Sequence, residues 1–161
     1  EISACLVGSE MCIRDRRMFM RVWRSVLASI AVSESLNLLI YVFAAPIFGI
    51  FTQDPAVIAL ARQIILVEFA LELGRSVNIT IVRCLIAVGD VRFPVGAALF
   101  STWFIAVGLG WLLGVHFGMG LVGLWIGMAA DECFRGLLFV LRFRAGGWQR
   151  FAEKAQGTMY A

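Results

Sequence analysis

Residues 56–88 read AVIALARQIILVEFALELGRSVNITIVRCLIAV, an apolar run longer than the roughly 17 to 25 residues that a membrane-spanning helix needs. Glu68, Glu72 and Arg75 lie near its middle. A charge at the centre of a membrane helix costs about 2.5 to 3.5 kcal/mol on insertion scales, so such side chains normally pair with one another or face a polar cavity. This pattern is typical of transport proteins.

Outside this stretch, three further apolar runs occupy residues 25–51, 93–115 and 121–141. Hydrophobic residues make up 61% of the 161-residue chain, and the mean hydropathy is +0.88. A soluble domain of this length has fewer apolar residues and spaces them amphipathically. The sequence therefore predicts an all-α integral membrane protein, a bundle of four transmembrane helices at about 25–51, 56–88, 93–115 and 121–141.

Basic residues gather where these runs begin and end. They include Arg17, Arg21 and Arg24 before the first run and Arg142, Arg144, Arg150 and Lys154 after the last. The loops 52–55 and 116–120 contain no lysine or arginine. The positive-inside rule then predicts a multi-pass protein of the inner membrane, with both ends and a short tail at 151–161 in the cytoplasm. The lipid bilayer is the expected partner, and the modest charge of +3 forms no stripe of the kind that binds nucleic acid.

A polar stripe follows the 56–88 helix, because four of its charged residues fall within roughly a third of the circumference at 3.6 residues per turn. They are Glu68, Glu72, Arg75 and Arg83, with Asn78 at the margin. Glu72 and Arg75 are spaced i, i+3, which allows an ion pair within the helix. Two interpretations stay open: a neutralised structural network, or a pathway that handles protons or substrate.

In the 121–141 run, Asp131, Glu132 and Arg135 are spaced i, i+1 and i+4, little more than one helical turn. Both acids compete for a single arginine. If Arg135 neutralises Asp131, Glu132 needs another partner, and we predict Arg75 in that role.

Weaker candidates lie in the two remaining runs. Glu34, Asn37 and Tyr41 share one face of the first helix, as structural contacts between helices or as lining of a pathway, and Pro46 predicts a kink near its outer end. Trp103 lies near mid-depth of the third helix, where it either packs in the core or contacts substrate.

Metal, cofactor and catalytic sites are not expected. His116 is the single histidine and lies at the outer edge of a predicted helix, and Cys84 and Cys133 stand in apolar helical surroundings. The chain therefore offers neither a metal-ligand cluster nor a nucleophile and base pair, which disfavours a membrane-embedded enzyme.

The first sixteen residues have a different character. LVGSEMCIRD at 6–15 resembles a translated end adapter of the kind used in transposase-based library preparation. We therefore expect residues 1–16 to be an artefact that carries Cys5 and Cys12, with the native sequence continuing from Arg17 as part of a longer protein.

Five short motifs follow one another along the chain. They are FTQD at 51–54, within the segment 39–57, ELGRSVN at 72–78, GDVRFPV at 89–95, GLVGLW at 120–125 and DECFRG at 131–136. Together they resemble the C-terminal end of a multidrug and toxic compound extrusion (MATE) family transporter. The resemblance implies two pseudo-symmetric six-helix lobes that export cationic or amphiphilic compounds by alternating access, driven by inward proton or sodium flow. On this reading the chain supplies the ninth to twelfth helices, and the missing N-terminal lobe of the same polypeptide is a partner.

The sequence leaves the coupling ion and two alternatives open. A lipid-linked substrate flippase or polysaccharide exporter of the same superfamily would show the same helices. A stand-alone four-helix membrane protein that assists assembly is the alternative from a different class. None of these readings needs a cofactor.

Overall fold

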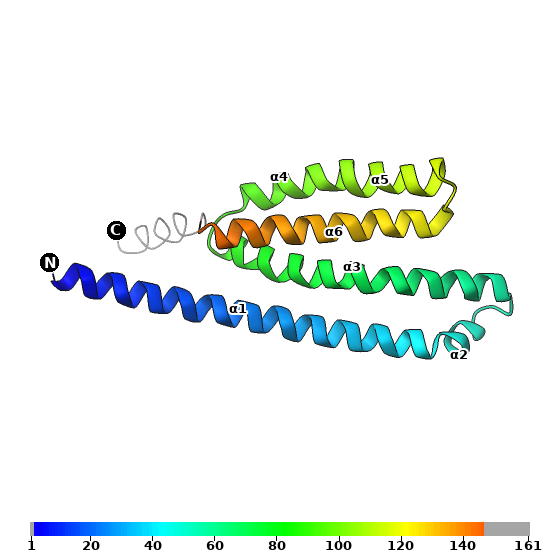
Figure 1. The fold of residues 1–161 in the computed structure, drawn as a ribbon, viewed down its shortest axis with the longest axis horizontal. Coiled ribbons are helices and arrows are strands. Elements are labelled where there is room, and N and C mark those ends of the chain that lie inside the picture. Colours follow the sequence, from blue (N-terminus) through cyan, green and yellow to red (C-terminus); the bar gives the residue numbers. More distant parts are fainter. Residues whose placement is uncertain (1, 147–161) are drawn as a thin grey trace.

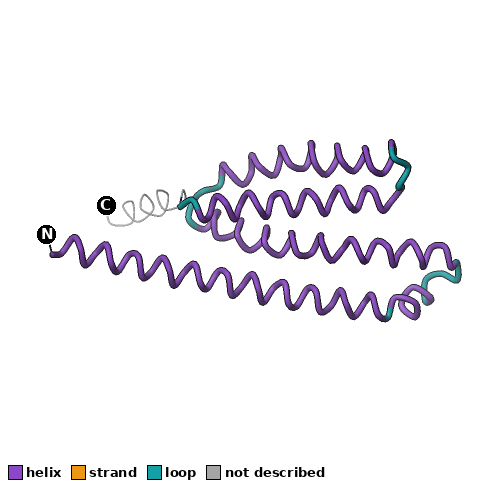
Figure 2. Tube along the Cα trace, viewed as in Figure 1, coloured by secondary structure: helices purple, strands orange, loops and turns teal. Residues whose placement is uncertain are grey.

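The computed structural model describes residues 2–146, with side chains from Met20 onward, and every regular element in this part of the chain is helical (Figures 1 and 2). The predicted tail at 151–161, with Arg150 and Lys154, lies outside the described residues. The elements are α1 (Ile2–Val42), α2 (Ala44–Gly49), α3 (Pro55–Ala87), α4 (Arg92–Ser101), η1 (Thr102–Val107), α5 (Gly108–Trp111), η2 (Leu112–His116) and α6 (Gly120–Arg144).

The long helices run antiparallel and lie in a row rather than around a common axis (Figure 1). α3 and α6 are the central pair, α1 packs on the free side of α3, and the helix Arg92–His116, which joins α4, η1, α5 and η2, packs on the free side of α6. We call this last one the α4–η2 helix. The two predicted runs with mid-depth charges therefore form the middle of the row.

The boundaries of three predicted helices agree closely with the structure. The runs 56–88, 93–115 and 121–141 correspond to Pro55–Ala87, Arg92–His116 and Gly120–Arg144. The run 25–51 differs, because α1 begins at Ile2 and ends at Val42, and α2 is a separate short helix. The apolar run predicts only the part of α1 that lipid can surround. The helix itself also includes the more polar turns before that run.

Pro46 explains why α1 stops at Val42, as the sequence predicted. Proline has no N–H to donate to the carbonyl four residues earlier, and its ring clashes with that carbonyl. The backbone bonds on either side, Phe43 to Leu39 and Ile47 to Phe43, are both formed at 3.0 Å. The break is therefore confined to one turn.

Both ends of α3 carry specific caps. Asp54 is the N-cap, where its side chain accepts from the Ala56 N–H at 2.9 Å, and Pro55 occupies the first helical position. At the other end Gly89, with φ of 90°, allows its own N–H to reach Ile86 O at 2.9 Å and the Asp90 N–H to reach Leu85 O at 3.0 Å. This is a Schellman motif, and it fixes where the chain turns toward α4.

The α4–η2 helix contains two π-helical segments, η1 and η2, where one regular helix was predicted. Glycines let it approach α6 closely: a Cβ on Gly127 would lie 2.6 Å from Gly110 N, and one on Gly123 would lie 2.6 Å from Gly114 N. A π segment absorbs an extra residue in a helix and re-aims the side chains beyond it. This combination was not visible in the spacing of the apolar residues.

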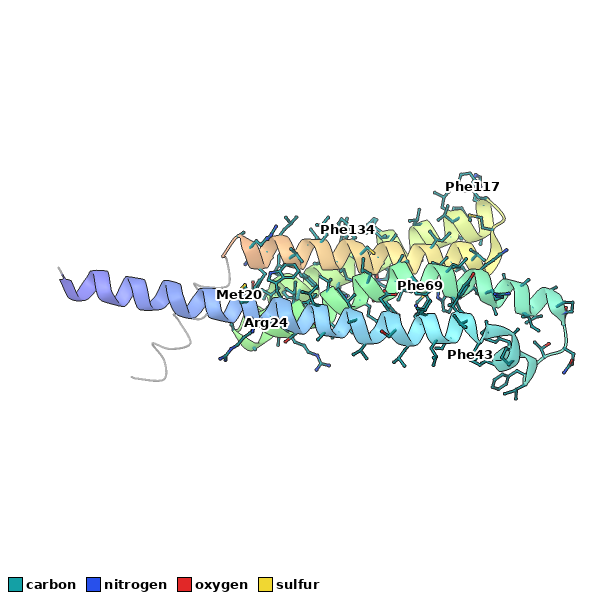
Figure 3. All side chains as sticks on the ribbon, turned by 60° about the horizontal axis from the view of Figure 1, so that its bottom comes forward. Met20, Arg24, Phe43, Phe69, Phe117 and Phe134 are labelled. Carbon is teal, nitrogen blue, oxygen red and sulfur yellow. The ribbon has the colours of Figure 1, made fainter. Side chains whose placement is uncertain are left out.

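The main cluster of buried apolar side chains lies at one end of the row. Val26, Ile81, Leu85, Phe139 and Phe143 form one cluster there, each at most 4% exposed. We call this end, near the α3–α4 turn, the Asp90 end, and the opposite end, with α2 and the η2–α6 turn, the Asp54 end. Figure 3 shows Met20 and Arg24 toward the first and Phe43 and Phe117 toward the second.

Two of the helices are long and apolar enough to cross a membrane, Met20–Val42 and Arg92–His116. α3 and α6 are at least as long but carry charged side chains in their central turns. Many large apolar side chains lie exposed on the outside of the row, among them Leu27, Leu36, Leu99 and Phe104. The molecule is thus an all-α membrane fragment whose two charged helices are flanked by two apolar ones.

Candidate ion and substrate pathway

The first group of charged side chains lies on α3 and consists of Glu68, Glu72 and Arg75. We call it the α3 cluster. Arg75 Nη1 lies 2.5 Å from Glu72 Oε1 and 3.7 Å from Glu68 Oε1, so the i, i+3 pair expected from the spacing is present. The side chains are 24%, 20% and 35% exposed, respectively. The cluster is therefore accessible from one side of the row.

Trp125 connects the α3 cluster to the neighbouring helix. Its indole N–H on α6 donates to Glu68 Oε2 at 2.5 Å. Trp125 was not among the predicted site residues, although a buried indole N–H needs a hydrogen-bond acceptor. The sequence did contain a hint of this contact, because Glu68 had no assigned partner and Trp125 lies on another predicted helix.

The second group lies on α6 and consists of Asp131, Glu132 and Arg135. We call it the α6 cluster. Arg135 Nη2 lies 2.5 Å from Asp131 Oδ2 and 2.9 Å from Glu132 Oε1, so one guanidinium serves both acids. Asp131 is only 3% exposed. This cluster is more deeply enclosed than the α3 cluster.

Neutral donors on two other helices complete the α6 cluster. Ser101 Oγ of α4, which is fully buried, donates to Asp131 Oδ1, and Asn78 Nδ2 of α3 donates to Glu132 Oε2 at 2.6 Å. The cluster therefore joins α3, α6 and the α4–η2 helix. Asn78 was predicted to belong to the charged stripe of α3, whereas Ser101 was missed because its partner lies on another helix.

The predicted pair between Glu132 and Arg75 is wrong. Glu132 is occupied by Arg135 and Asn78, and Arg75 turns back to acids on its own helix. Each arginine has an acid one turn away on its own helix. A pair at i, i+3 forms whatever the position of the neighbouring helix, so it is favoured over a contact between helices. The charged residues thus form two local clusters instead of one pair across the interface.

Both clusters contain two carboxylates and one guanidinium. Neutral donors, Trp125, Asn78 and Ser101, contact the acids but add no positive charge. In apolar surroundings an ionised carboxylate that lacks a counter-charge is costly. Each cluster therefore holds one carboxylate more than it has guanidinium groups.

Glu34 and Asn37 lie on the α1 face that packs against α3. Asn37 is 7% exposed, and Asn37 Nδ2 and Glu34 Oε1 are buried without a hydrogen-bond partner. The Glu72 carboxylate acts electrostatically on Glu34, which places the two acids close together. This face thus extends the α3 cluster toward α1 with a third acid.

Tyr41, the third predicted residue of that face, contacts aromatic and cationic groups instead of carboxylates. Its ring meets Phe69 edge to face, with centroids 6.4 Å apart, and the Arg62 guanidinium lies 5.5 Å above it. Arg62 was not among the predicted candidates. It is the one exposed arginine in the described chain that lies toward the Asp54 end.

Trp103 belongs to neither cluster. It lies on η1 with 68% of its surface exposed, so the expected packing in the core does not occur among the described residues. The π-helical turns re-aim this part of the helix, and the face that meets α6 is made of glycines instead.

Asp90 and Arg142 form an ion pair that the sequence analysis did not anticipate. Arg142 Nε lies 3.0 Å from Asp90 Oδ2, and Asp90 is 2% exposed. The same guanidinium lies 4.9 Å from the centre of the Phe93 ring. This contact clamps the α3–α4 turn to the last turn of α6 at the Asp90 end.

An antiparallel row of long apolar helices with enclosed, partly neutralised charge clusters defines a polytopic membrane protein of the transporter class. Comparison with known sequences identifies it further: the family profile described as MatE matches residues 5–112, and the chain belongs to this family of secondary transporters. The match begins inside the adapter-like segment, so the adapter origin of residues 1–16 stays a prediction.

Curated relatives agree with this assignment. The chain is 39% identical over 128 residues to the Uncharacterized transporter YisQ of Bacillus subtilis, a match that covers 80% of the chain and 28% of the relative. The Probable multidrug resistance protein NorM of Thermotoga maritima is 27% identical over 124 residues, which is 77% of the chain and 27% of that relative. The NorM protein of Xanthomonas campestris is 33% identical over 119 residues, 74% of the chain and 25% of the relative. The chain thus spans about a quarter of these relatives, and no solved structure matches it.

Proposed function

We propose that the chain forms part of a cation-coupled antiporter that exports amphiphilic or cationic compounds. The observation that carries the proposal is the composition of the α3 cluster, two carboxylates against one guanidinium in the middle of a membrane helix. The name multidrug resistance protein, borne by several relatives, supports a drug-like substrate. The coupling ion is a proton or sodium.

The two clusters take different parts in this proposal. The α6 cluster is the more enclosed, with Asp131 and Arg135 side chains 5% and 18% exposed, and it is bonded to three helices, which suits holding the helices in register. The α3 cluster is open on one side and adjoins Glu34, which suits a group that exchanges its bound cation. We therefore assign the pathway to the α3 cluster and Glu34.

The remaining partners follow from the same proposal. The rest of a longer polypeptide covers the open side of the row and completes the pathway, and the bilayer of the bacterial inner membrane covers the exposed apolar side chains. The Asp90 end, where the arginines gather, faces the cytoplasm.

A chimera tests the proposal. The segment of the Xanthomonas campestris relative that aligns with this chain is replaced by the chain, and export of a lipophilic cationic dye is measured in cells without other exporters. We expect resistance and dye export above the empty vector. A chimera that reaches the membrane at the level of its parent but exports nothing would contradict the proposal.

Glu72→Gln in the chimera tests the role of the α3 cluster. The change removes the excess carboxylate and should reduce dye export to the level of the empty vector while membrane abundance is kept. Asp54→Asn is the matched acid-to-amide control, because Asp54 is exposed and asparagine caps a helix equally well. Undiminished export by Glu72→Gln would reject a coupling role for this cluster.

A further inference from the structure

The Asp90 end carries a set of exposed arginines that the proposed export function does not use. They come from every long helix of the row: Arg21 and Arg24 on α1, Arg83 on α3, Arg92 on α4 and Arg144 on α6. We call them the arginine collar. Figure 3 shows Arg24 near this end, away from the labelled phenylalanines of the Asp54 end.

Among residues 20–146, whose side chains are described, no exposed acid lies near the collar. Among the same residues, the one carboxylate at this end is that of Asp90, which is 2% exposed and already paired with Arg142. The collar is therefore a surface of a single sign. Such a surface attracts anionic groups and repels cations.

Four of the five collar arginines, one on each long helix, continue an exposed apolar face of their own helix. Leu27 follows Arg24 by three residues, and Val95 follows Arg92 by three. At such a spacing the two side chains lie on the same side of a helix. The arginines thus point outward with the apolar side chains and away from the partner helices.

The same relation holds on the two central helices. Leu141 precedes Arg144 by three residues, and Ile86 follows Arg83 by three, all of them exposed. An apolar face that ends in a guanidinium matches the order of a bilayer leaflet, in which acyl chains end at phosphate groups.

From this arrangement we propose that the arginine collar binds the headgroups of anionic phospholipids in the leaflet at the Asp90 end. The guanidinium presents parallel N–H donors that fit phosphate oxygens, and the sequence uses arginine almost throughout, with Lys154 as its single lysine. Nucleic acid fits this surface less well, because the collar adjoins exposed apolar side chains, which acyl chains cover and a nucleic acid does not. The inference stands apart from export, since it needs only that the helices lie in a bilayer.

Lipid retention measured by native mass spectrometry tests the proposal. The 161-residue chain is reconstituted in equimolar phosphatidylglycerol and phosphatidylcholine, released, and the lipids that remain bound are counted. We expect the unmodified chain to retain more phosphatidylglycerol than phosphatidylcholine. This enrichment should fall about fivefold in each of Arg24→Gln, Arg92→Gln and Arg144→Gln, because each variant loses one basic residue near an anionic surface. Lysine at the same positions should keep most of the enrichment.

Arg62→Gln is the matched control. Arg62 is also an exposed arginine on a long helix, but it lies toward the other end and its guanidinium covers the Tyr41 ring. This variant should retain phosphatidylglycerol as the unmodified chain does. An equal loss in Arg62→Gln would show that any arginine suffices and would overturn the proposal.

Two measurements on the unmodified chain keep the test independent of variants that fail to fold. Enrichment should decline steadily as sodium chloride is raised, because exposed charges are screened. Equal retention of both lipids at low salt would overturn the proposal. Displacement of phosphatidylglycerol by inorganic phosphate, where sodium chloride of the same ionic strength has no effect, would assign the collar to free phosphate and likewise overturn it.

Discussion

Arg135 is the residue on which the α6 cluster depends, because its guanidinium is the single positive charge within reach of Asp131 and Glu132 in the described chain. Its Nε is buried without a partner, so both of its ion pairs are made through Nη2. Buried carboxylates that lose their counter-charge destabilise a fold far more than a surface pair does.

Arg135→Gln should lower the free energy of unfolding by about 3 kcal/mol, since it leaves two enclosed carboxylates without a cation. Denaturation by sodium dodecyl sulfate in mixed micelles, followed by circular dichroism, measures this. Adding Asp131→Asn should restore part of the loss by removing one of the carboxylates. Arg144→Gln, an exposed change on the same helix, should stay within about 0.5 kcal/mol of the unmodified chain. Equal effects of the two arginine changes would contradict this account.

The clamp between Asp90 and Arg142 makes a second prediction at this scale. In a double-mutant cycle, Asp90→Asn and Arg142→Gln should show a coupling energy of about 0.5 to 3 kcal/mol, because the two side chains contact each other directly. Unfolding in mixed micelles without anionic lipid again provides the measurement. Additive effects would mean that the pair contributes nothing beyond its separate side chains.

At the scale of the helices, the crossing of α3 and α6 is set by glycine. A Cβ on Gly74 would lie 2.6 Å from Cys133 N and 2.9 Å from Cys133 Cα, a contact that backbone atoms cannot avoid without moving apart. The clusters on these helices keep their partners, Trp125 and Asn78, only at this separation.

Gly74→Ala should therefore destabilise the chain by about 1 to 3 kcal/mol, the usual cost of overpacking. Gly96→Ala is the control, because nothing lies within 4 Å of its added Cβ, and there the better helix propensity of alanine should stabilise by up to about 1 kcal/mol. Opposite signs in the two unfolding curves are the expected result. A neutral or stabilising Gly74→Ala would show that the helices can separate at little cost.

The helices themselves were largely predictable from the sequence, and their partners were not. Apolar runs end where Asp54, Pro55, Gly89 and Gly120 appear, residues that cap or interrupt helices for local reasons. The intrahelical pair of Glu72 and Arg75 followed from spacing in the same way. Ser101, Trp125 and the π-helical turns depend on how one helix is rotated against the next, which the period of a single helix does not determine.

The whole molecule is unevenly packed along its length. The buried apolar cluster and the Asp90–Arg142 pair lie at one end, whereas Ile50 and Phe51 at the other are each 81% exposed. Local opening is governed by such differences in burial.

Hydrogen exchange in micelles should show this gradient. Amides of residues 81–85 should exchange about tenfold more slowly, or slower still, than those of residues 44–52, because opening the former disrupts the core cluster. Mass spectrometry of peptic fragments resolves the two regions. Equal protection at both ends would contradict the packing described here.

The row of helices also determines how the parts of the molecule influence one another. α1 meets α2 and α3, and the α4–η2 helix meets α6 along its length and α3 only beside the turn, so α1 and the α4–η2 helix share no direct contact. Away from the Asp90 end, where Val26 of α1 and Phe93 of α4 pack on the same core cluster, energetic effects of changes in the two outer helices should simply add, since residues without common neighbours act independently. Any cooperation between the edges of the row has to pass through α3 and α6, by way of this core cluster, the paired glycines and the charged side chains.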